Sequence, residues 1–367
     1  MVKNIERSSG TITMVQLTMV FMLAIGLNNH VIIIPLLLRA AGRDAWFAVC
    51  LSVLFVLMGM VVVQYIISTA KQQHIGLWLR GHIGAMATNG LLFLMSLSLF
   101  FNATITIRDT ITWAKIYLPT TPTLTLVIPL VGLCFYSAYA GIGSIAITSG
   151  ILLPLVVIFG LFVGTANLPH KDVSLLFPLL EYGWNPVSQG MFYAAAGFSE
   201  LCAVLYIQHY VKTEIRYWML AVNVFILAWL TLGPLYGAIA EFGPTEAASL
   251  RYSPYEEWRL VTFGHFFEHV DFLALYQWIS GALIRISLMM FLIVELFQLQ
   301  QGKKRTWSLM ILFVLSFGIS VIPMSSMQFM TVLESILVPG VLYSVGVVVI
   351  ALFMIAWWSR QREVTSN

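Results

Sequence analysis

Charged side chains are scarce in this 367-residue sequence. Asp, Glu, Lys and Arg make up 10% of it, whereas hydrophobic residues make up 59%, and the mean hydropathy is +0.89. A soluble domain carries about 25% charged residues, so this chain lacks the polar side chains that a water-facing surface of ordinary area requires. The composition argues against a soluble globular protein and predicts a polytopic integral membrane protein surrounded by a lipid bilayer.

Cysteine is also scarce, and its distribution argues against cross-links. Cys50, Cys134 and Cys202 lie far apart in apolar runs, without a CxxC motif or a neighbouring pair of histidines at ligand spacing. An odd, dispersed set of this kind predicts neither disulfides nor a zinc site. We interpret the three cysteines as small buried hydrophobic residues and predict no metal site and no cofactor.

Motifs of catalysis and signs of nucleic-acid binding are missing as well. No P-loop, HExxH or GxSxG motif occurs, and Gly141 and Gly143 in "YAGIGSIAI" follow no strand, which indicates helix-packing or turn glycines. The net charge of +3 is too small to indicate nucleic acid. The apolar run after "MVKNIERSSGTITM" is too long for a cleavable signal peptide. We therefore predict neither an enzyme nor a nucleic-acid-binding protein.

Long apolar runs dominate what is present. A helix needs about 20 apolar residues to cross a bilayer core of about 30 Å. We also expect an amphipathic segment over 71–89 and a short helix after Pro254 in a long loop. The runs predict a single all-α membrane domain, residues 1–367, with ten transmembrane helices over 13–38, 46–69, 87–113, 124–140, 143–168, 187–210, 217–240, 271–297, 307–323 and 336–358.

The positions of lysine and arginine predict the orientation, because cytoplasmic loops of membrane proteins carry more of them. If the N-terminus is cytoplasmic, the inner segments hold eleven of these residues and the outer segments seven. Both termini are then predicted to be cytoplasmic. The inner set is Lys3, Arg7, Lys71, Arg80, Lys212, Arg216, Lys303, Lys304, Arg305, Arg360 and Arg362, and the outer set is Arg39, Arg43, Arg108, Lys115, Lys171, Arg251 and Arg259.

Two of the ten runs are interrupted by polar residues. The first contains Asn28, Asn29 and His30 side by side in "AIGLNNHVIIIP". The sixth contains "GFSE", which places a carboxylate at mid-depth, where an unpaired charge costs at least about 2.5–3.5 kcal/mol. The members of that second interruption are Gly197, Phe198, Ser199 and Glu200.

Interruptions in the first and sixth helices are typical of an inverted-repeat transporter fold. We predict a first five-helix repeat over 13–168 and an inverted second repeat over 187–358, with unwound backbone at both interruptions facing a shared cavity. A substrate carboxylate would lie against a half-helix N-terminus. A straight first helix, whose Asn28, Asn29 and His30 bond to neighbouring helices, remains an open alternative.

Arg285 lies close to the middle of the eighth predicted helix. Since a lone buried charge is costly, we predict that it pairs with Glu200, either as part of a ligand site or as a purely structural lock. Ser98 and Asn102, four residues apart on the third helix, share a face that borders the cavity or holds helices together. Other charged residues receive no role in the site. Arg108 with Asp109 is interpreted as a solvated or interfacial pair. His209 and Glu295 lie near cytoplasmic ends, where such side chains can reach the interface, and no role is assigned to them.

Three blocks of the sequence resemble the B subunits of bacterial spore nutrient-germinant receptors. They are "IIIPLLLRAAGRDAWFAVCL", "NLPHKDVSLLFPLLEYGWNPVSQGMFYAAAGFSELCAVLYIQHYVK" and "FFEHVDFLALYQWISGALIRIS". That family belongs to the amino acid–polyamine–organocation superfamily, and the resemblance implies its five-plus-five inverted fold. It also implies a small-molecule germinant (an amino acid, sugar or nucleoside), partner A and C subunits, and a place in the spore inner membrane.

The resemblance also implies a ligand pocket. Many relatives carry glycines in the first interruption, where this chain has Asn-Asn-His, so its pocket is expected to be narrower and more polar. Ligand sensing is the leading interpretation, a proton- or sodium-coupled amino acid transporter is the alternative, and a scaffold for partner subunits is a third. The implied pocket residues are Asn28, Asn29, His30, Ser98, Asn102, Gly197, Phe198, Ser199, Glu200 and Arg285.

Overall fold

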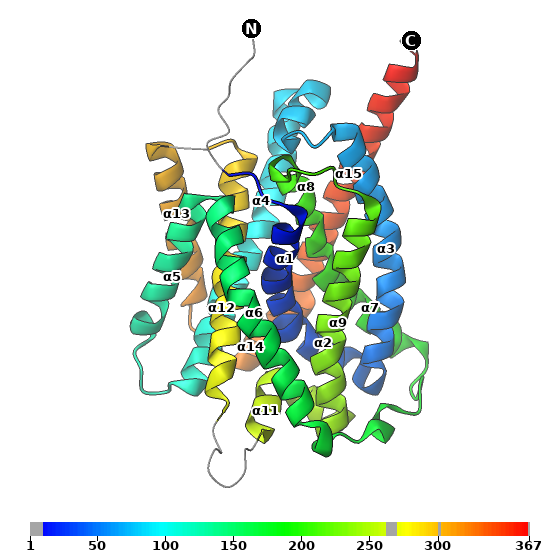
Figure 1. Ribbon diagram of the computed structural model, residues 1–367, viewed down its shortest axis with the longest axis vertical. Helices are drawn as coiled ribbons and strands as arrows, with labels where there is room; N and C mark the ends of the chain where they lie inside the picture. The colour runs from blue at the N-terminus through cyan, green and yellow to red at the C-terminus, as the bar shows by residue number, and fades with distance from the viewer. Residues whose placement is uncertain (1–9, 262–269, 300–301, 366–367) are drawn as a thin grey trace.

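The computed structural model describes residues 10–261, 270–299 and 302–365, and nearly all of them are helical (Figure 1). Lys3, Arg7 and positions 266–269 of the third matching block lie outside the described residues. The elements are α1 (Met14–Asn28), η1 (Asn29–Ile33), α2 (Ile34–Ala41), η2 (Gly42–Asp44), α3 (Ala45–Ala70), α4 (Ile75–Tyr117), α5 (Thr123–Ala140), α6 (Ile142–Ala166), η3 (Leu168–His170), η4 (Val173–Leu176), α7 (Trp184–Ser199), η5 (Glu200–Ala203), α8 (Val204–Ile207), η6 (Gln208–Tyr210), α9 (Tyr217–Phe242), α10 (Pro244–Ser249), α11 (Ser253–Leu260), α12 (Phe272–Leu296), α13 (Lys303–Ser320), α14 (Ser326–Val332), η7 (Leu333–Leu337) and α15 (Val338–Thr365).

Each of the ten predicted ranges overlaps a helix or a helical run, although several ends differ. Within the described residues, seven helical segments are long and apolar enough to cross a membrane. The first of them, Met14–Ala70, has 57 residues and would be about 85 Å long if straight, far more than a bilayer core. The chain folds back at Gly42, whose φ of 52° favours glycine. The segment therefore consists of two antiparallel helical stretches, one before Gly42 and one after it. The count of ten spans and the five-plus-five repeat stay predictions.

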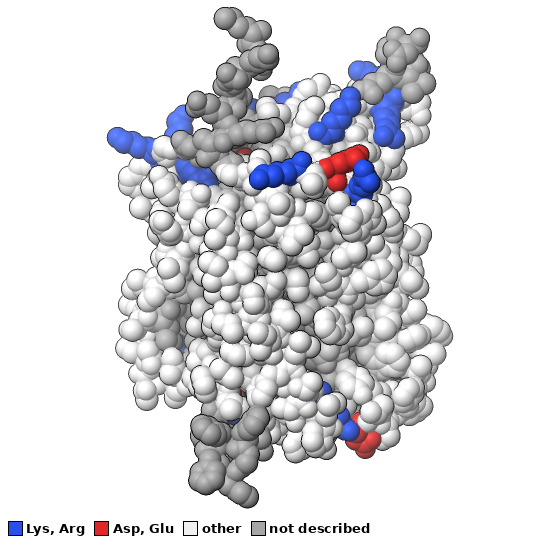
Figure 2. Space-filling view, in the orientation of Figure 1, with Lys and Arg blue, Asp and Glu red and all other residues white. Residues whose placement is uncertain are grey.

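The two ends of the bundle differ. The start of α1 and the end of α15 lie at one end, which we call the terminal end, while α10 and α11 lie at the opposite end, which we call the loop end (Figure 1). On the face in Figure 2, Lys and Arg side chains lie near the ends, more of them at the terminal end, and an uncharged flank separates them. Large hydrophobic side chains exposed along the helices, such as Phe55 and Met58 of α3, suit contact with lipid.

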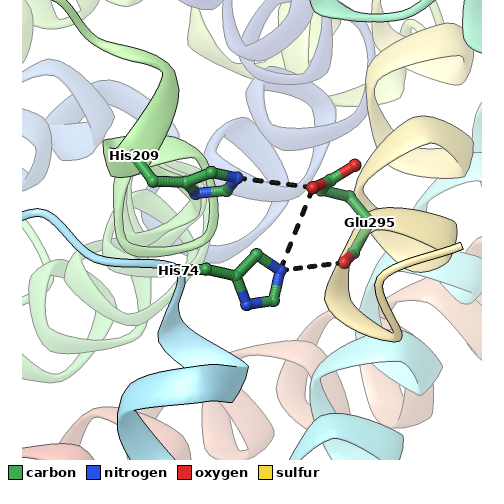
Figure 3. A group of neighbouring side chains, drawn as sticks. All are labelled: His74, His209 and Glu295. Carbon is green, nitrogen blue, oxygen red and sulfur yellow. Dashed lines mark hydrogen bonds and ion pairs between the residues drawn. The ribbon is translucent and has the colours of Figure 1, made fainter. Parts of the chain in front are cut away.

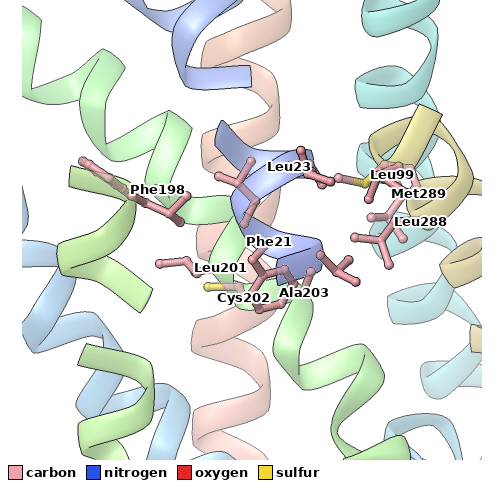
Figure 4. Close-up of a cluster of buried hydrophobic side chains, with 14 of the residues drawn as sticks. Phe21, Leu23, Leu99, Phe198, Leu201, Cys202, Ala203, Leu288 and Met289 are labelled. Carbon is pink, nitrogen blue, oxygen red and sulfur yellow. The ribbon is translucent and has the colours of Figure 1, made fainter. Parts of the chain in front are cut away.

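The centre of the bundle is built around α12. It packs against α1, α4, α5 and α6. In the most apolar 18-residue stretch of α12, 89% of the residues are buried, compared with 22% in that of α6. Around it, Phe21, Leu99, Phe198 and Met289 belong to one hydrophobic core cluster (Figure 4). A charged residue on α12 is therefore surrounded by protein rather than lipid.

Two predicted connections have their expected helices. The short helix after Pro254 is α11, which begins at Ser253 with Pro254 in its first turn. The segment 71–89 contains the start of α4, which bends at Gly84, where φ is 75° and ψ is 173°. Because L side chains rarely adopt that φ, glycine allows the first turns of α4 to leave the axis of the rest.

A backbone contact joins two distant segments at the terminal end, and we call this link the closure of that end. Ile12 and Val211 form an isolated parallel β-bridge, in which the Ile12 amide donates to the Tyr210 carbonyl at 2.9 Å and the Lys212 amide donates to the Ile12 carbonyl at 3.0 Å. The chain just before α1 is thereby tied to the chain just after η6. The three cysteines are free, and Cys134 and Cys202 are buried as predicted, whereas Cys50 is exposed.

Candidate functional site

Arg285 lies at the centre of the bundle with none of its side chain exposed, and all of its N–H groups have acceptors. Its Nε donates to Thr106 Oγ1 at 2.8 Å, and Nη1 donates to the Ala24 carbonyl at 3.1 Å. Nη2 donates to the side-chain oxygens of Asn28 and Asn102, both at 3.1 Å. A buried guanidinium satisfied in this way is held in one orientation.

Glu200 supplies the charge that balances Arg285. Oε1 of Glu200 accepts from Nη2 at 2.6 Å, and Oε2 accepts from Nη1, which gives the two-point geometry that fits a carboxylate to a guanidinium. The structure thus has the ion pair that the sequence predicts. Each partner alone would be an unpaired charge in a low-dielectric interior, which proteins rarely tolerate.

Both interruptions are present, but neither is unwound. The first is a π-helical turn, η1, in which the Ile34 amide donates to the Asn29 carbonyl. The second is a 3₁₀ turn, η5, which starts at Glu200 and follows α7 directly. The expectation of unwound backbone was therefore wrong, because the helical path continues through both positions. The altered winding still leaves carbonyls for other donors: the Gly26 carbonyl contacts His30 Nδ1 at 2.9 Å, and the Val31 carbonyl accepts from Arg251 at 3.2 Å.

The three polar residues of the first interruption point in different directions. Asn28 faces Arg285, whereas the Asn29 amide donates to Thr231 Oγ1 on α9 at 3.0 Å. His30 bonds to its own helix. Only Asn28 of the three therefore contacts the ion pair. Asn29 does connect the two interruptions, because a Cβ on Gly197 would lie well inside van der Waals contact of its Oδ1.

Two small cavities adjoin the ion pair. One has a volume of about 10 Å³ and is lined by Asn28, Asn102 and Glu200 together with apolar side chains of η1, α4, α7, η7 and α15. The other has a volume of about 20 Å³ and is lined by Ser98, Asn102, Ser199, Glu200 and neighbours that include Cys202. Each has room for about one water molecule, so a larger ligand requires the surrounding helices to move apart. Asn102 and Glu200 border both cavities, so a ligand that enlarged either one would contact this central network.

The remaining predicted residues lie around these cavities. Ser98 Oγ lies 2.6 Å from Ser344 Oγ on α15, and Ser199 Oγ donates to the Ala196 carbonyl at 2.7 Å. Phe198 is fully buried in the apolar cluster of Figure 4 and lines neither cavity. Asn28, Asn102, Glu200 and Arg285 form the central network, Ser98 and Ser199 border the second cavity, and Asn29, His30, Gly197 and Phe198 pack behind them.

Thr106 was absent from the predicted site although it accepts the Nε hydrogen bond of Arg285. A signal for it was present, because Ser98, Asn102, Thr106 and Thr110 recur every four residues along α4 and hence share one face. Thr110 continues that face toward the loop end, where its Oγ1 accepts from Trp278 Nε1 at 3.3 Å.

A second buried ion pair covers the loop end of the central network. Asp109 is 1% exposed, and its Oδ1 accepts from Arg251 Nη2 and from the Tyr252 hydroxyl at 3.2 Å. Trp113 and Trp278 stack beside it with ring centroids 4.3 Å apart. The interpretation of Arg108 with Asp109 as a solvated or interfacial pair was wrong, because Arg108 donates instead to carbonyls at the end of α13 and just beyond it.

A third polar cluster lies at the terminal end (Figure 3). His74 Nε2 contacts the Glu295 carbonyl at 3.0 Å, and His209 Nε2 lies 3.4 Å from Glu295 Oε1. Glu295 is 1% exposed. The Glu295 carboxylate thus turns inward toward two histidines and does not reach the interface.

The chain shares its fold with solved transporters of the APC type. The structure of MhsT in complex with L-phenylalanine is similar with a TM-score of 0.59 and 13% identity, over 90% of this chain and 87% of that one. Mhp1, a nucleobase-cation-symport-1 family transporter in a closed conformation with bromovinylhydantoin bound, is similar with a TM-score of 0.52 and 12% identity, over 89% of this chain and 75% of that one. At these identities the likeness shows the fold alone.

Sequence similarity identifies the family within that class. The family model described as "Spore germination protein" matches residues 11–329. Spore germination protein XB of Bacillus anthracis is 40% identical over 348 residues, which are 95% of this chain and 98% of that relative. The chain belongs to the spore germination protein family, which confirms the resemblance. It is an integral membrane protein whose family and fold are those of permeases and transporters.

Proposed function

We propose that this chain is the germinant-sensing subunit of a spore germination receptor. It would bind a small nutrient molecule beside the Arg285–Glu200 pair, and the bound state would trigger germination. The observation that carries this proposal is a polar, charge-balanced network, shared by two cavities, at the centre of a transporter-like bundle. Family membership supports the link to germination.

Ligand binding at this network requires an exchange of partners. Because the N–H groups of Arg285 already have acceptors, a ligand carboxylate or hydroxyl must replace Asn28, Asn102 or Glu200. A polar group left unpaired by an unsuitable ligand costs about 1–3 kcal/mol, which corresponds to roughly 5- to 150-fold in affinity. Selectivity would therefore arise from how well a ligand replaces the bonds that it breaks.

The proposal includes a place and partners. The chain would lie in the spore inner membrane with both termini in the cytoplasm and would act with A and C subunits of the receptor. Its two five-helix halves, 13–168 and 187–358, would move relative to each other when a germinant binds. Asn29, His30, Gly197 and Phe198 would act indirectly, by positioning Asn28 and Glu200.

Binding and germination assays test this proposal. Purified chain in lipid nanodiscs is screened with amino acids, sugars and nucleosides, and thermal unfolding reports which of them binds. We expect one class to raise the unfolding temperature, and Asn102→Ala to weaken that effect at least tenfold in ligand concentration. Arg259→Ala serves as the matched control, since Arg259 is exposed and pairs only with Glu256 among the described residues.

Spores that carry the Asn102→Ala chain should need correspondingly more germinant. If the variant binds and germinates like the parent chain, the central network is not the germinant site. If no compound of the three classes changes the unfolding temperature while germination still depends on the chain, the sensing role is wrong and the scaffold interpretation gains.

A second candidate is a proton- or sodium-coupled amino acid transporter. The transporter-like fold favours it, and so does Glu200, a carboxylate at the centre of the bundle. Contacts also join distant segments at both ends, through the Arg251–Asp109 pair at the loop end and the Ile12–Val211 bridge at the terminal end. Uptake of a labelled amino acid into proteoliposomes that contain this chain alone would establish transport. Binding without uptake would favour the sensing role.

A further inference from the structure

His74, His209 and Glu295 come from three different elements and meet at the terminal end (Figure 3). His74 is the N-cap of α4, His209 lies in η6 and Glu295 lies in the last turn of α12. One ligand atom from each residue can be chosen so that all three lie within 4.8 Å of one another. We propose that these side chains form a transition-metal site of the zinc class that joins the three elements.

The distances are close to those of a metal centre. Zinc bonds of about 2.0–2.1 Å in tetrahedral geometry place ligand atoms about 3.3 Å apart. His209 Nε2 lies 3.4 Å from Glu295 Oε1, and His74 Nε2 lies 3.9 Å from the same oxygen. The three ligand atoms lie within 4.8 Å of one another, so the longest edge, between the two imidazoles, must shorten by about 1.5 Å to complete three sides of a tetrahedron. A water molecule would take the fourth position.

The cluster has unused bonding capacity. Glu295 Oε2 and His209 Nδ1 are buried and have no hydrogen-bond partner among the described residues. The 3.4 Å separation between His209 and Glu295 is also long for a hydrogen bond. The Glu295 carboxylate is 1% exposed, and a cation at its unbonded Oε2 side would add to the compensation that the neighbouring His209, Tyr210 and Arg305 already supply. Two imidazoles and one carboxylate favour zinc or a similar transition metal over magnesium or calcium, which prefer oxygen ligands.

The surroundings of His74 can support metal binding. In the structure its Nδ1 accepts from the Gly76 amide at 3.1 Å, so Nε2 carries the proton that points to the Glu295 carbonyl. A metal on Nε2 would replace that proton and place one on Nδ1, which would break the hydrogen bond from the Gly76 amide. The Gln298 side-chain amide lies 3.5 Å from Nδ1, and turning it over would present its oxygen to that new N–H.

The position of the site suggests its consequence. Tyr210, next to His209, accepts the backbone hydrogen bond from Ile12 that closes the terminal end. A bound metal would hold the end of η6 against α4 and α12 and so keep that closure in place. This consequence for opening rests on the proposed function, whereas metal binding itself does not.

Zinc binding to the full chain tests the inference. Chelator-treated protein in nanodiscs is titrated with Zn²⁺, and Co²⁺ absorption reports the coordination geometry. We expect about one Zn²⁺ per chain, a higher unfolding temperature with Zn²⁺ but not with Mg²⁺, and at least tenfold weaker binding in His209→Ala and in the milder Glu295→Gln. His82→Ala is the matched control, because His82 lies nearby on α4 and bonds to Trp78 and Ser359.

Substoichiometric zinc on the parent chain would overturn the inference, and so would equal binding by His209→Ala or equal loss in His82→Ala. Thermal unfolding without metal shows that each variant is folded before it is compared. Germinant binding is measured on the same samples. Zinc binding without any germinant response would contradict only the proposed function, and the reverse result would contradict only the metal site.

Discussion

The two buried arginine–carboxylate pairs of this protein differ in how completely they are bonded. Arg285 and Glu200 meet at two points, and the remaining N–H groups of Arg285 reach Ala24, Asn28, Asn102 and Thr106. The Arg251 side chain is 18% exposed and meets one oxygen of Asp109, while Asp109 Oδ2 has no hydrogen-bond partner among the described residues. The central pair is built to stay fixed, whereas the loop-end pair resembles a latch that can open at lower cost.

Breaking the central pair should have the largest effect. We expect Arg285→Ala to lower the free energy of unfolding by about 3–5 kcal/mol, because Glu200 would remain as a buried, uncompensated charge. Thermal unfolding in nanodiscs measures it. The double replacement Arg285→Met with Glu200→Gln should recover most of the loss. No recovery would mean that shape, rather than charge balance, holds this region together.

Breaking the loop-end pair should cost less and should open the protein. We expect Arg251→Ala to lower the free energy of unfolding by about 1–3 kcal/mol, since water reaches this pair more easily. Cys202 is buried and lines a central cavity, so faster maleimide labelling of its thiol would report opening. Labelling is measured with Cys50 and Cys134 replaced by alanine. Unchanged labelling would contradict the latch interpretation.

The packing behind the central pair can be tested at Gly197. A Cβ there would collide with the Asn29 amide oxygen, so Gly197→Ala should lower the free energy of unfolding by about 1–3 kcal/mol. Adding Asn29→Ala should restore part of that loss by making room. If the changes that Gly197→Ala and Asn29→Ala make to the free energy of unfolding simply add, the two side chains do not collide. Gly233→Ala is a suitable control, because a Cβ at Gly233 would meet nothing within 4 Å.

A smaller effect is expected at the loop end from Glu257 of α11. Burial, and then the nearby Glu241, raise the pKa of Glu257 well above its usual value. The folded protein thus holds the proton, and stability should be highest at acidic pH and fall as the pH rises toward that raised pKa. Glu257→Gln should flatten this decline and add about 1 kcal/mol at pH 8. Parallel pH profiles of unfolding temperature for the two proteins would refute this assignment.

Hydropathy predicted where the long helical runs lie, because the cost of exposing backbone to lipid leaves few alternatives. It did not predict their ends, since α4 begins 12 residues before and α15 ends 7 residues after the predicted ranges. The same reasoning predicted the Arg285–Glu200 pair, since two charges at mid-depth must find each other. It did not predict that Asp109 pairs with Arg251, 142 residues away, instead of with its neighbour Arg108. Partners that distant depend on how the loop end packs, which local sequence does not encode.

The type of helical winding at the two interruptions could not be predicted from the sequence either. Asn-Asn-His indicated a disturbance in the first helix, but a π-helical turn and an unwound segment satisfy the same polar residues equally well. The choice depends on contacts with other helices, such as those of Asn29 with Thr231 and Gly197. The cluster of His74, His209 and Glu295 was missed for a similar reason, because its members are far apart in the chain.

The β-bridge between Ile12 and Val211 has a consequence for how the family can evolve. Both of its hydrogen bonds run between backbone groups, so they survive nearly any side-chain change at either position, and only proline at 12 or 212 would remove a donor. The backbone link at the terminal end therefore tolerates most substitutions at these positions. Side chains around the central cavities can therefore change without this backbone link being rebuilt each time.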